Sequence, residues 1–435
     1  DITFTPLEIH RTGSAEEALE YLQNNTVDLV VTMLQVRDSN AFAFGRAVKE
    51  LDPSLPVFCL THNYSSLESC GVGQECTGVD RTFLWNNYPT FLLSLIKLAE
   101  DGLNVDHDIR EGGVRVIILV EDDIRFYSTY LPIFYTAVLK QTQELICEGL
   151  NAAHRLLRQR ARPKILLAET YEEAWELYER YKKNLLGVVS DMSFPRKGKV
   201  DSTAGLHLLN RMKSENPDLP ILMQSSQEGY AVQAKELGAS FCSKKSKNLL
   251  SHLQNFMLDS LGFGDFVFRN AEGREFGRAA DIKSLQEILP RIPEQSLIYH
   301  ATRNHFSNWL SARTEFELAD CIRPITFRSF ENASKLRTYL IETLFEYREN
   351  NQRGVITDFS RGQFDRTANF VRIGGGSIGG KARGLAFVNA LIDHHNLRHR
   401  FDNVKVYVPR SAVVGTDIFD RFFASNELWS FILQT

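Results

Sequence analysis

Short apolar runs alternate with amphipathic helical segments in two stretches of the chain, which is the pattern of a parallel α/β sheet. In the second stretch the almost wholly apolar run Val114–Val120 is typical of a central strand. Four more strands, each followed by a helix, complete a predicted (βα)5 domain over residues 113–262. The later elements are expected at Lys164–Ala168, Tyr171–Lys183, Leu185–Ser190, Ala204–Ser214, Ile221–Gln224, Ala231–Leu237, Ser240–Ser243 and Lys247–Ser260.

The first stretch repeats this order from its second strand onward, which indicates an internal repeat. The likeness is visible in VDLVVTMLQV beside NLLGVVSDMS. We therefore predict a second copy of the domain over residues 1–105, without its first strand, and a linker over the polar, glycine-containing residues 100–113. Its elements are expected at Leu7–His10, Ala15–Leu22, Asp28–Leu34, Phe42–Leu51, Pro56–Leu60, Thr82–Trp85 and Tyr88–Ala99.

The pattern changes after residue 262. Residues 263–365 predict a small hairpin or an irregular segment that turns at Glu272–Gly273. A mostly helical module without recognisable chemistry follows, with helices at Ile282–Leu289, His305–Leu318 and Ser334–Glu349. Residues 366–435 begin with a glycine-rich turn at 374–380, followed by a helix at Lys381–His394. Because the chain begins at Asp1 and stops inside this last segment, we expect it to be part of a longer protein.

Composition narrows the class of protein. The 435 residues are enough for two to four domains, and the 43% hydrophobic and 24% charged residues are ordinary for a globular protein. The net charge of -4 makes nucleic acid an unlikely partner unless a local basic patch binds it. Six cysteines without a CxxC pair fit a reducing compartment, and no apolar run approaches membrane-helix length. We expect a cytoplasmic protein that does not bind membranes.

Candidate chemistry lies where the strands of the second stretch end. The polar side chains at these positions are Glu121, Asp122, Asp123, Asp191, Ser225 and Lys244. Parallel strands end at one edge of a sheet, so these groups should converge there. Clustered carboxylates repel one another, and a hard divalent cation such as Mg2+ would relieve that repulsion. A carboxylate beside Mg2+ can accept a phosphoryl group, and a lysine and a hydroxyl can hold the phosphoryl oxygens.

The segments VIILVEDD, VVSDMSFP, PILMQSS and FCSKK resemble the receiver domains of two-component response regulators. The resemblance implies phosphorylation by a histidine kinase or a small phosphodonor. It also implies roles for seven residues: Glu121 and Asp122 as metal carboxylates, Asp191 as phosphoacceptor and metal ligand, Ser193 as a metal ligand through its carbonyl, Ser225 as switch hydroxyl, Phe241 as switch aromatic, and Lys244 as the phosphoryl-binding lysine.

The chain departs from the receiver pattern in two places. Lys245 stands where the family usually has proline, and the segment Ile124–Pro163 is about twice as long as usual. We interpret this segment as a contact helix, either between the two receiver-like domains or between two chains of a homodimer. The alternative is a helix that folds back on its own domain with a kink at Pro132. The apolar positions that share one helix face are Tyr127, Leu131, Phe134, Val138, Leu145 and Ile146.

In the first stretch the phosphoacceptor position falls on Met33, which cannot accept a phosphoryl group. Thr61 matches the switch hydroxyl, but Trp85 and Asn86 stand where the lysine would be. We interpret the first stretch as a degenerate receiver that serves packing or partner binding.

The segment IGGGSIGGKARGLAFVNALI with the later VKVYVPRSAVV resembles the start of the nucleotide-binding domain of phosphoenolpyruvate synthase and pyruvate phosphate dikinase, an ATP-grasp-like fold. The resemblance implies that Gly379, Gly380 and Lys381 contact ATP phosphates. A flexible connector is the alternative, because Ala382 breaks the P-loop spacing.

Two further groups have less specific readings. The basic run 154–164 is either a solvated helix face or a nucleic-acid contact. The cluster of His300, Arg303, His305 and Trp309 favours packing over a metal site.

The leading functional hypothesis is a phosphorelay module that is phosphorylated on Asp191 and regulates a phosphoenolpyruvate synthase-like output. The alternative is the N-terminal part of a working dikinase with ancillary receivers, and a pure scaffold is a third reading. We do not expect this chain to be catalytic alone.

Overall fold

The computed structural model describes residues 8–64, 77–85, 90–324, 327–352, 355–359, 368, 370–395 and 397–429. The fold is mixed α/β with parallel sheets. The chain forms two compact units, Asp1–Leu139 with Pro163–Leu261, and Lys140–Arg162 with Gly262–Thr435. Within the described residues, no helix is both long enough and apolar enough to cross a membrane.

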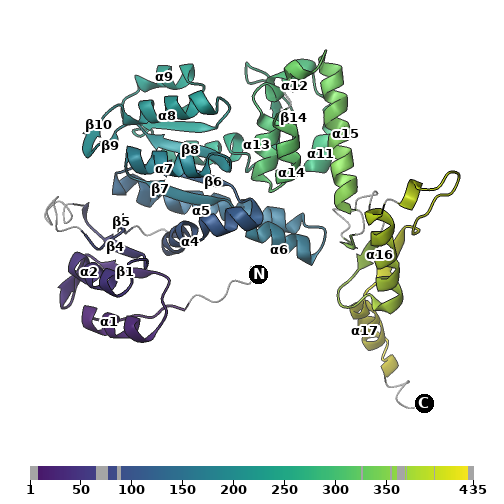
Figure 1. Cartoon of the computed structure of the whole chain (residues 1–435), viewed down its shortest axis with the longest axis horizontal. Coiled ribbons are helices and arrows are strands. Elements are labelled where there is room, and N and C mark those ends of the chain that lie inside the picture. The colour runs from purple at the N-terminus through teal and green to yellow at the C-terminus, as the bar shows by residue number, and fades with distance from the viewer. Residues whose placement is uncertain are drawn as a thin grey trace. The chain divides into compact units, whose positions relative to one another are not determined.

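The first unit contains a five-stranded parallel sheet whose order is β12-β11-β8-β6-β7. Strands β6, β7 and β8 are labelled in Figure 1. This is the flavodoxin-like order, in which the first strand lies between the second and the third. Every residue of β6 is buried, as its apolar sequence predicts. The strands are β6 (Val116–Val120), β7 (Lys164–Ala168), β8 (Leu185–Asp191), β11 (Ile221–Ser225) and β12 (Ser240–Ser243).

The helices of this domain begin and end close to their predicted positions. They are α7 (Tyr171–Tyr181), α8 (Ala204–Glu215), α9 (Tyr230–Glu236) and α10 (Leu249–Asn255), the last followed by a π-helical turn at Phe256–Ser260. A short hairpin of β9 (Phe194–Arg196) and β10 (Lys199–Asp201) follows β8. We call residues 113–139 and 163–261 the second domain.

The same unit contains a smaller parallel sheet with the order β1-β4-β5. Its strands are β1 (Val30–Met33), β4 (Val57–Thr61) and β5 (Arg81–Leu84), with helices α1 (Ala15–Asn24) and α2 (Ala41–Leu51) and a short hairpin of β2 (Gln35–Val36) and β3 (Ser39–Asn40). We call residues 8–85 the first domain. The predicted strand at Leu7–His10 is wrong for residues 8–10, which are irregular, and Leu7 lies outside the described residues.

The predicted linker at 100–113 is also wrong, because helix α4 (Phe91–Gly112) continues through it and ends at Gly113, whose φ of 62° caps it. Two of its acidic residues, Asp101 and Asp108, bind groups of the second domain. The fully buried Asp101 accepts hydrogen bonds from the Tyr135 hydroxyl at 2.8 Å and the Ile165 amide at 2.9 Å. Asp108 lies 2.6 Å from the buried Lys164 ammonium group. The polar composition of residues 100–113 therefore suggested a linker, whereas Asp101 and Asp108 use their polar side chains to contact the second domain.

The long segment after β6 forms α5 (Ile124–Cys147) and α6 (Ala152–Arg160). Helix α5 continues through Pro132, and the Thr136 hydroxyl donates to the Pro132 carbonyl at 2.6 Å. Five of the six apolar residues on the predicted face are buried within the chain itself: Tyr127, Leu131, Phe134, Val138 and Leu145.

The second unit contains the predicted hairpin, β13 (Phe266–Arg269) and β14 (Glu275–Ala279), with Gly273 at φ 84°. Helices α11 (Ile282–Ile288), α12 (Glu294–Ala301) and α15 (Ala333–Gln352) surround an apolar core with it. The single helix predicted at His305–Leu318 is wrong. Two helices, α13 (His305–Ala312) and α14 (Phe316–Ile322), are separated at Thr314, whose φ of 65° is left-handed.

The C-terminal part of this unit is a three-stranded parallel sheet, with the order β15-β16-β17. Its strands are β15 (Thr357–Asp358), β16 (Phe370–Ile373) and β17 (Ser411–Val414). Helix α16 (Gly379–His394) follows the glycine-rich turn, and α17 (Thr416–Ser425) follows β17.

Candidate functional site

The predicted acids meet at the carboxyl edge of the five-stranded sheet. Glu121 and Asp122 follow β6, and Asp191 ends the neighbouring strand β8. The adjacent strands β6 and β8 are the first and third strands of this domain, and the sheet has its switch point between them. At a switch point the helices that follow the two strands leave on opposite faces and open a crevice. One carboxylate oxygen from each acid lies within 4.8 Å of the other two. Glu121 is fully buried, and Asp191 is nearly so.

Lys244 lies among these carboxylates. Its Nζ is 2.7 Å from Glu121 Oε2 and 2.8 Å from Asp191 Oδ2, and its side chain is only 4% exposed. Its backbone N–H donates to the Ser225 carbonyl at 2.9 Å, which fixes the lysine where β12 ends. The ammonium group also lies 4.2 Å from the centre of the Phe126 ring. The sequence predicted the lysine but not this aromatic contact from the first turn of α5.

Burial and mutual repulsion favour the protonated form of two of these acids. Loss of hydration raises the pKa of Glu121 to about 8, although Lys244 opposes the rise. Burial, followed by repulsion from Asp191, raises the pKa of Asp122 to about 6. The attraction of Glu121 and Asp191 outweighs burial at Lys244 and raises its pKa. One cation is therefore too few for three converging carboxylates.

Asp123 does not belong to this cluster, although it was one of the acids expected at the edge. Its carboxylate accepts hydrogen bonds from the Arg125 backbone N–H at 2.9 Å and from the Arg125 guanidinium group at 2.9 Å. Burial raises the pKa of Asp123, but these bonds to Arg125 outweigh it, so the net shift is downward. Asp123 directly precedes helix α5, and its carboxylate orients Arg125.

The remaining predicted residues lie close to these acids in the chain or in the sheet register. Ser225 is buried at the end of β11, and its hydroxyl accepts a hydrogen bond from the Gln227 amide at 3.0 Å. Phe241, on β12, is half-buried and packs against the domain core. Ser193 is half-buried two residues after Asp191.

The sequence reasoning missed Gly205, at the start of α8. A Cβ atom at this position would lie 2.2 Å from the Asp191 carbonyl oxygen and 2.8 Å from Met192 Cα. The Gly205 N–H donates to the Met192 carbonyl at 3.0 Å. The glycine therefore lets α8 approach the backbone that carries Asp191. A glycine near the start of the helix after the third strand was the available signal.

The donor set fits a hard divalent cation. Glu121 Oε2 is buried and lacks hydrogen-bond geometry to any partner, although the Lys244 ammonium group lies near it. Carboxylate oxygens are the ligands that Mg2+ prefers, and it retains several waters. Within the described residues, Glu121, Asp122 and Asp191 form the one group of at least three acids, histidines or cysteines whose ligand atoms converge for a metal.

The first domain has a different side chain at the equivalent position. Met33 ends β1 and is 38% exposed. Thr61 ends β4, and its hydroxyl donates to the Asn63 carbonyl at 3.0 Å. Trp85 follows β5, and Asn86 lies outside the described residues. No acid ends β1, so the described residues of this edge offer no phosphoacceptor carboxylate.

The glycine-rich turn leads into the first turn of α16, where Gly379, Gly380 and Lys381 are exposed. Gly379 has φ 74°, a conformation that favours glycine. The turn is anchored by the Thr416 hydroxyl, which accepts from the Ser377 amide at 3.0 Å. The exposed amino end of a helix that also carries a lysine is compatible with phosphate binding.

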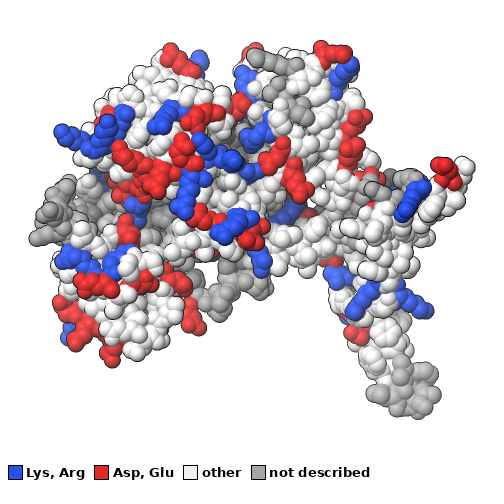
Figure 2. Space-filling model, in the orientation of Figure 1, with Lys and Arg blue, Asp and Glu red and all other residues white. Residues whose placement is uncertain are grey.

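The basic run at 154–164 forms ion pairs rather than a free basic face. Arg158 lies 2.7 Å from Glu315 and 3.3 Å from Glu148, and Arg155 pairs with Asp358. Figure 2 shows acidic and basic side chains interspersed over the described part of the viewed face, without a continuous basic stripe.

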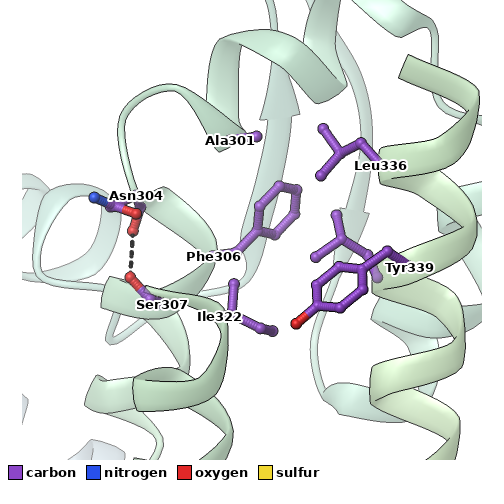
Figure 3. A pocket seen from close by; sticks show the side chains of 8 residues that line it. Ala301, Asn304, Phe306, Ser307, Ile322, Leu336 and Tyr339 are labelled. Carbon is purple, nitrogen blue, oxygen red and sulfur yellow. Dashed lines mark hydrogen bonds between the residues drawn. The ribbon is translucent and has the colours of Figure 1, made fainter. Parts of the chain in front are cut away.

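The histidine cluster is packed in the core of the second unit. His300 Nε2 accepts a hydrogen bond from the Arg269 amide at 2.9 Å, and His300 Nδ1 lies 2.9 Å from His305 Nδ1. A small pocket nearby is mostly apolar, and the Ser307 hydroxyl on its wall donates to the Asn304 carbonyl at 3.0 Å (Figure 3). Neither feature brings together a set of groups that suggests catalysis.

Comparisons with known proteins found similar solved structures at low sequence identity. No protein-family model matches the sequence, and no curated protein matches it. One similar solved structure is a response regulator receiver domain protein from Clostridium thermocellum, with 15% identity over 33% of this chain and 95% of that one and a TM-score of 0.20. Another is the Mn2+-bound form of the response regulator Rcp1, with 16% identity over 33% and 92% of the two chains and a TM-score of 0.20. The fold assignment rests on the strand order described above.

Proposed function

We propose that this chain is a two-component signalling module in which Asp191 accepts a phosphoryl group from a histidine kinase or a small phosphodonor. The observation that carries the proposal is the convergence of Glu121, Asp122 and Asp191 at the switch point, with Lys244 held between two of them. A lone acid at a strand end would be an ordinary loop residue. Three acids and a buried lysine at one point are costly without a ligand.

In the proposed reaction, an Asp191 carboxylate oxygen attacks the donor's phosphorus atom. A phosphorus–oxygen bond forms as the bond between phosphorus and the donor's leaving atom breaks, and the leaving group keeps the electron pair. Lys244 holds the phosphoryl oxygens by charge-assisted hydrogen bonds, for which it is already in place 2.8 Å from Asp191. The Ser225 hydroxyl would turn from the Gln227 amide toward the phosphoryl group.

Glu121, Asp122, Asp191 and the Ser193 carbonyl would hold Mg2+. When bound, the cation neutralises the acids and the charge of the transferring phosphoryl group. The phosphoryl group would then change the environment of Lys244 and Ser225 and bias the surface near Phe241 toward a second state.

We further propose the division into a degenerate receiver at 1–105, an intact receiver at 113–262, a helical adaptor at 263–365 and the start of a phosphoenolpyruvate synthase-like domain at 366–435. In this proposal the exposed Gly379, Gly380 and Lys381 would contact ATP phosphates. Under the alternative, the chain is the N-terminal part of a working dikinase and the receivers are ancillary. Self-association through 124–163 would use the exposed Leu156 and Leu157 of α6.

The test is binding of the phosphoryl mimic beryllofluoride in the presence of MgCl2. A ligand that binds only the native state stabilises it by RT ln(1+[L]/Kd). We expect a rise in melting temperature for the wild type and none for Asp191→Asn. Asp123→Asn is the matched control, because it makes the same substitution at a neighbouring carboxylate that Arg125 already binds, and it should respond as the wild type does. If wild type and Asp191→Asn respond alike, Asp191 is not the phosphoacceptor.

A further inference from the structure

The first domain contacts the second beside the proposed metal site, through the free edge of β5. Alternate residues of β5 bond to β4, so the Thr82 carbonyl and the Leu84 N–H point away from that strand. Helix α5 satisfies both groups: the Tyr127 hydroxyl donates to the Thr82 carbonyl, and the Leu84 N–H donates to Ser128 Oγ at 2.9 Å. An exposed strand edge invites pairing with another chain, so this helix gives β5 a specific cover.

Apolar packing accompanies these bonds. Phe83 is fully buried, and its ring meets the edge of the Tyr127 ring at 5.5 Å between centroids. Tyr127 lies six residues after Glu121 and five after Asp122. The contact is therefore built on the first two turns of the helix that begins at the metal carboxylates.

Arg81, on the same strand, extends the contact to the end of β7. Its guanidinium group pairs with Glu173, lies 3.4 Å from Glu169 and donates to the Leu167 carbonyl at 3.2 Å. Glu169 follows β7 directly, and the Glu121 amide donates to the Ala168 carbonyl at 3.0 Å. A cation of the first domain thus pairs with Glu169 at the strand end beside the site and with Glu173 in the first turn of α7.

A third contact joins the first domain to Asp123. The guanidinium carbon of Arg125 lies 4.8 Å from the centre of the Tyr64 ring, and the same guanidinium group binds the Asp123 carboxylate. Arg81, Tyr64 and the edge of β5 therefore surround the segment that carries Glu121 and Asp122. None of these three features follows from the receiver resemblance.

From this geometry, and resting on the function proposed above, we propose that docking of the first domain regulates the acidic site by lowering its affinity for the divalent cation. Arg81 partly neutralises the negative field in which a cation at Glu121 and Asp122 would bind. The field effect is short-ranged in water but larger for half-buried groups, and the Arg81 side chain is 23% exposed. Asp122 and Glu169 repel each other electrostatically. Burial raises the pKa of Glu169 to about 7, Arg81 opposes the rise and Asp122 adds to it.

Coupling of this kind is reciprocal. If docking weakens cation binding by some factor, cation binding must weaken docking by the same factor. The degenerate first domain would then act as a sensor in the same chain, because the contacts that β5 and Arg81 make with the second domain would loosen when the site of the second domain is loaded. This gives a role to a domain whose Met33 cannot take a phosphoryl group.

The experiment measures Mn2+ binding to the full chain by the electron paramagnetic resonance signal of free Mn2+, with Mg2+ as competitor. For Arg81→Gln we expect about fivefold tighter binding at low salt, a coupling of ordinary size. Arg37→Gln is the matched control, because it removes the same charge from an exposed position in the turn between β2 and β3. It should leave the affinity unchanged, and Arg81→Lys should lie between wild type and Arg81→Gln.

A second variant separates docking from charge. Tyr127→Phe removes the bond to the Thr82 carbonyl without changing any charge. It should also tighten Mn2+ binding and speed amide hydrogen exchange over residues 81–85. Saturating Mg2+ should speed the same exchange in the wild type. Equal Mn2+ affinity in wild type, Arg81→Gln and Tyr127→Phe overturns the coupling, whereas absence of Mn2+ binding to the wild type overturns the metal site itself.

Discussion

Replacing Asp122 by asparagine should stabilise the metal-free protein and abolish its response to Mg2+. Its ordinary pKa of 3.8 rises to about 6 in the fold, because burial and Asp191 both disfavour the charged form. A rise of about 2 units corresponds to about 3 kcal/mol at about 1.4 kcal/mol per unit. Because Asp122 is only half-buried, solvent screening reduces this, and we expect a gain of about 1–2 kcal/mol for Asp122→Asn.

The sign of the pH dependence follows from the direction of the shift. A carboxyl group whose pKa is raised on folding binds protons more tightly in the native state. It therefore lowers the free energy of unfolding by its full amount above about pH 6 and not at all below about pH 4. The advantage of Asp122→Asn should therefore be largest near pH 8, about half as large at pH 5 and absent near pH 3.5. In the presence of Mg2+ the wild type should be more stable than Asp122→Asn, because Mg2+ stabilises only the wild type.

The assay is thermal unfolding of the full chain, following the transition that shifts with Mg2+, in EDTA and in MgCl2. Asp123→Asn is the matched control, because it removes the neighbouring carboxylate, which Arg125 already neutralises. It should give no stabilisation in EDTA and should retain the response to Mg2+. If Asp122→Asn lowers the melting temperature in EDTA, or if both variants behave alike, the repulsion argued for the cluster is absent.

Three further expectations follow from the same structure. After treatment with acetyl phosphate, mass spectrometry should find phosphate on Asp191 and none on residues 1–105, where Met33 replaces the acceptor; phosphate in that range would contradict the degenerate reading. Gly205→Ala should lower the free energy of unfolding by about 2–3 kcal/mol, because its Cβ would meet the Asp191 backbone at 2.2 Å. Urea denaturation would measure this loss against Gly229→Ala, where the added Cβ meets nothing within 4 Å. An equal loss in both variants would show that Gly205 has no special role at the site. The purified chain should not consume ATP in the presence of pyruvate, and a coupled assay that detected turnover would favour the dikinase alternative.

The strand pattern predicted most strands of the second domain well because they are buried. Strand β7 has the predicted limits Lys164–Ala168, since an apolar run between turns marks a buried parallel strand. The edge strand β12 also has its predicted limits, Ser240–Ser243, although Cys242 is its one buried residue. The strand ends also predicted which acids converge, because parallel strands place their carboxyl ends at one edge. Local pattern and topology together were enough for this part of the site.

The same reasoning failed where long-range contacts decide the structure. Residues 100–112 are polar, yet they are helical because Asp101 and Asp108 bind Tyr135 and Lys164. Asp123 was expected to converge with the other strand-end groups, whereas its carboxylate binds Arg125 instead. Nothing in the sequence could place Arg81 beside Glu169, because that ion pair joins residues 88 positions apart. Charges that look solvent-exposed in a sequence are assigned to partners only by the fold.

Charge balance argues that cation binding precedes phosphorylation at the proposed site. When all three carboxylates are ionised, they and the lysine carry a net charge of about −2, which one divalent cation would neutralise. Without the cation, an incoming phosphoryl group of about −2 would meet an edge that already repels it. With the cation, the acyl phosphate replaces the charge of Asp191, and Lys244 remains to hold its oxygens. Arg81 and Arg125 neutralise Glu169 and Asp123 separately. The negative charge left at Glu121, Asp122 and Asp191 is therefore the charge that a bound divalent cation would neutralise.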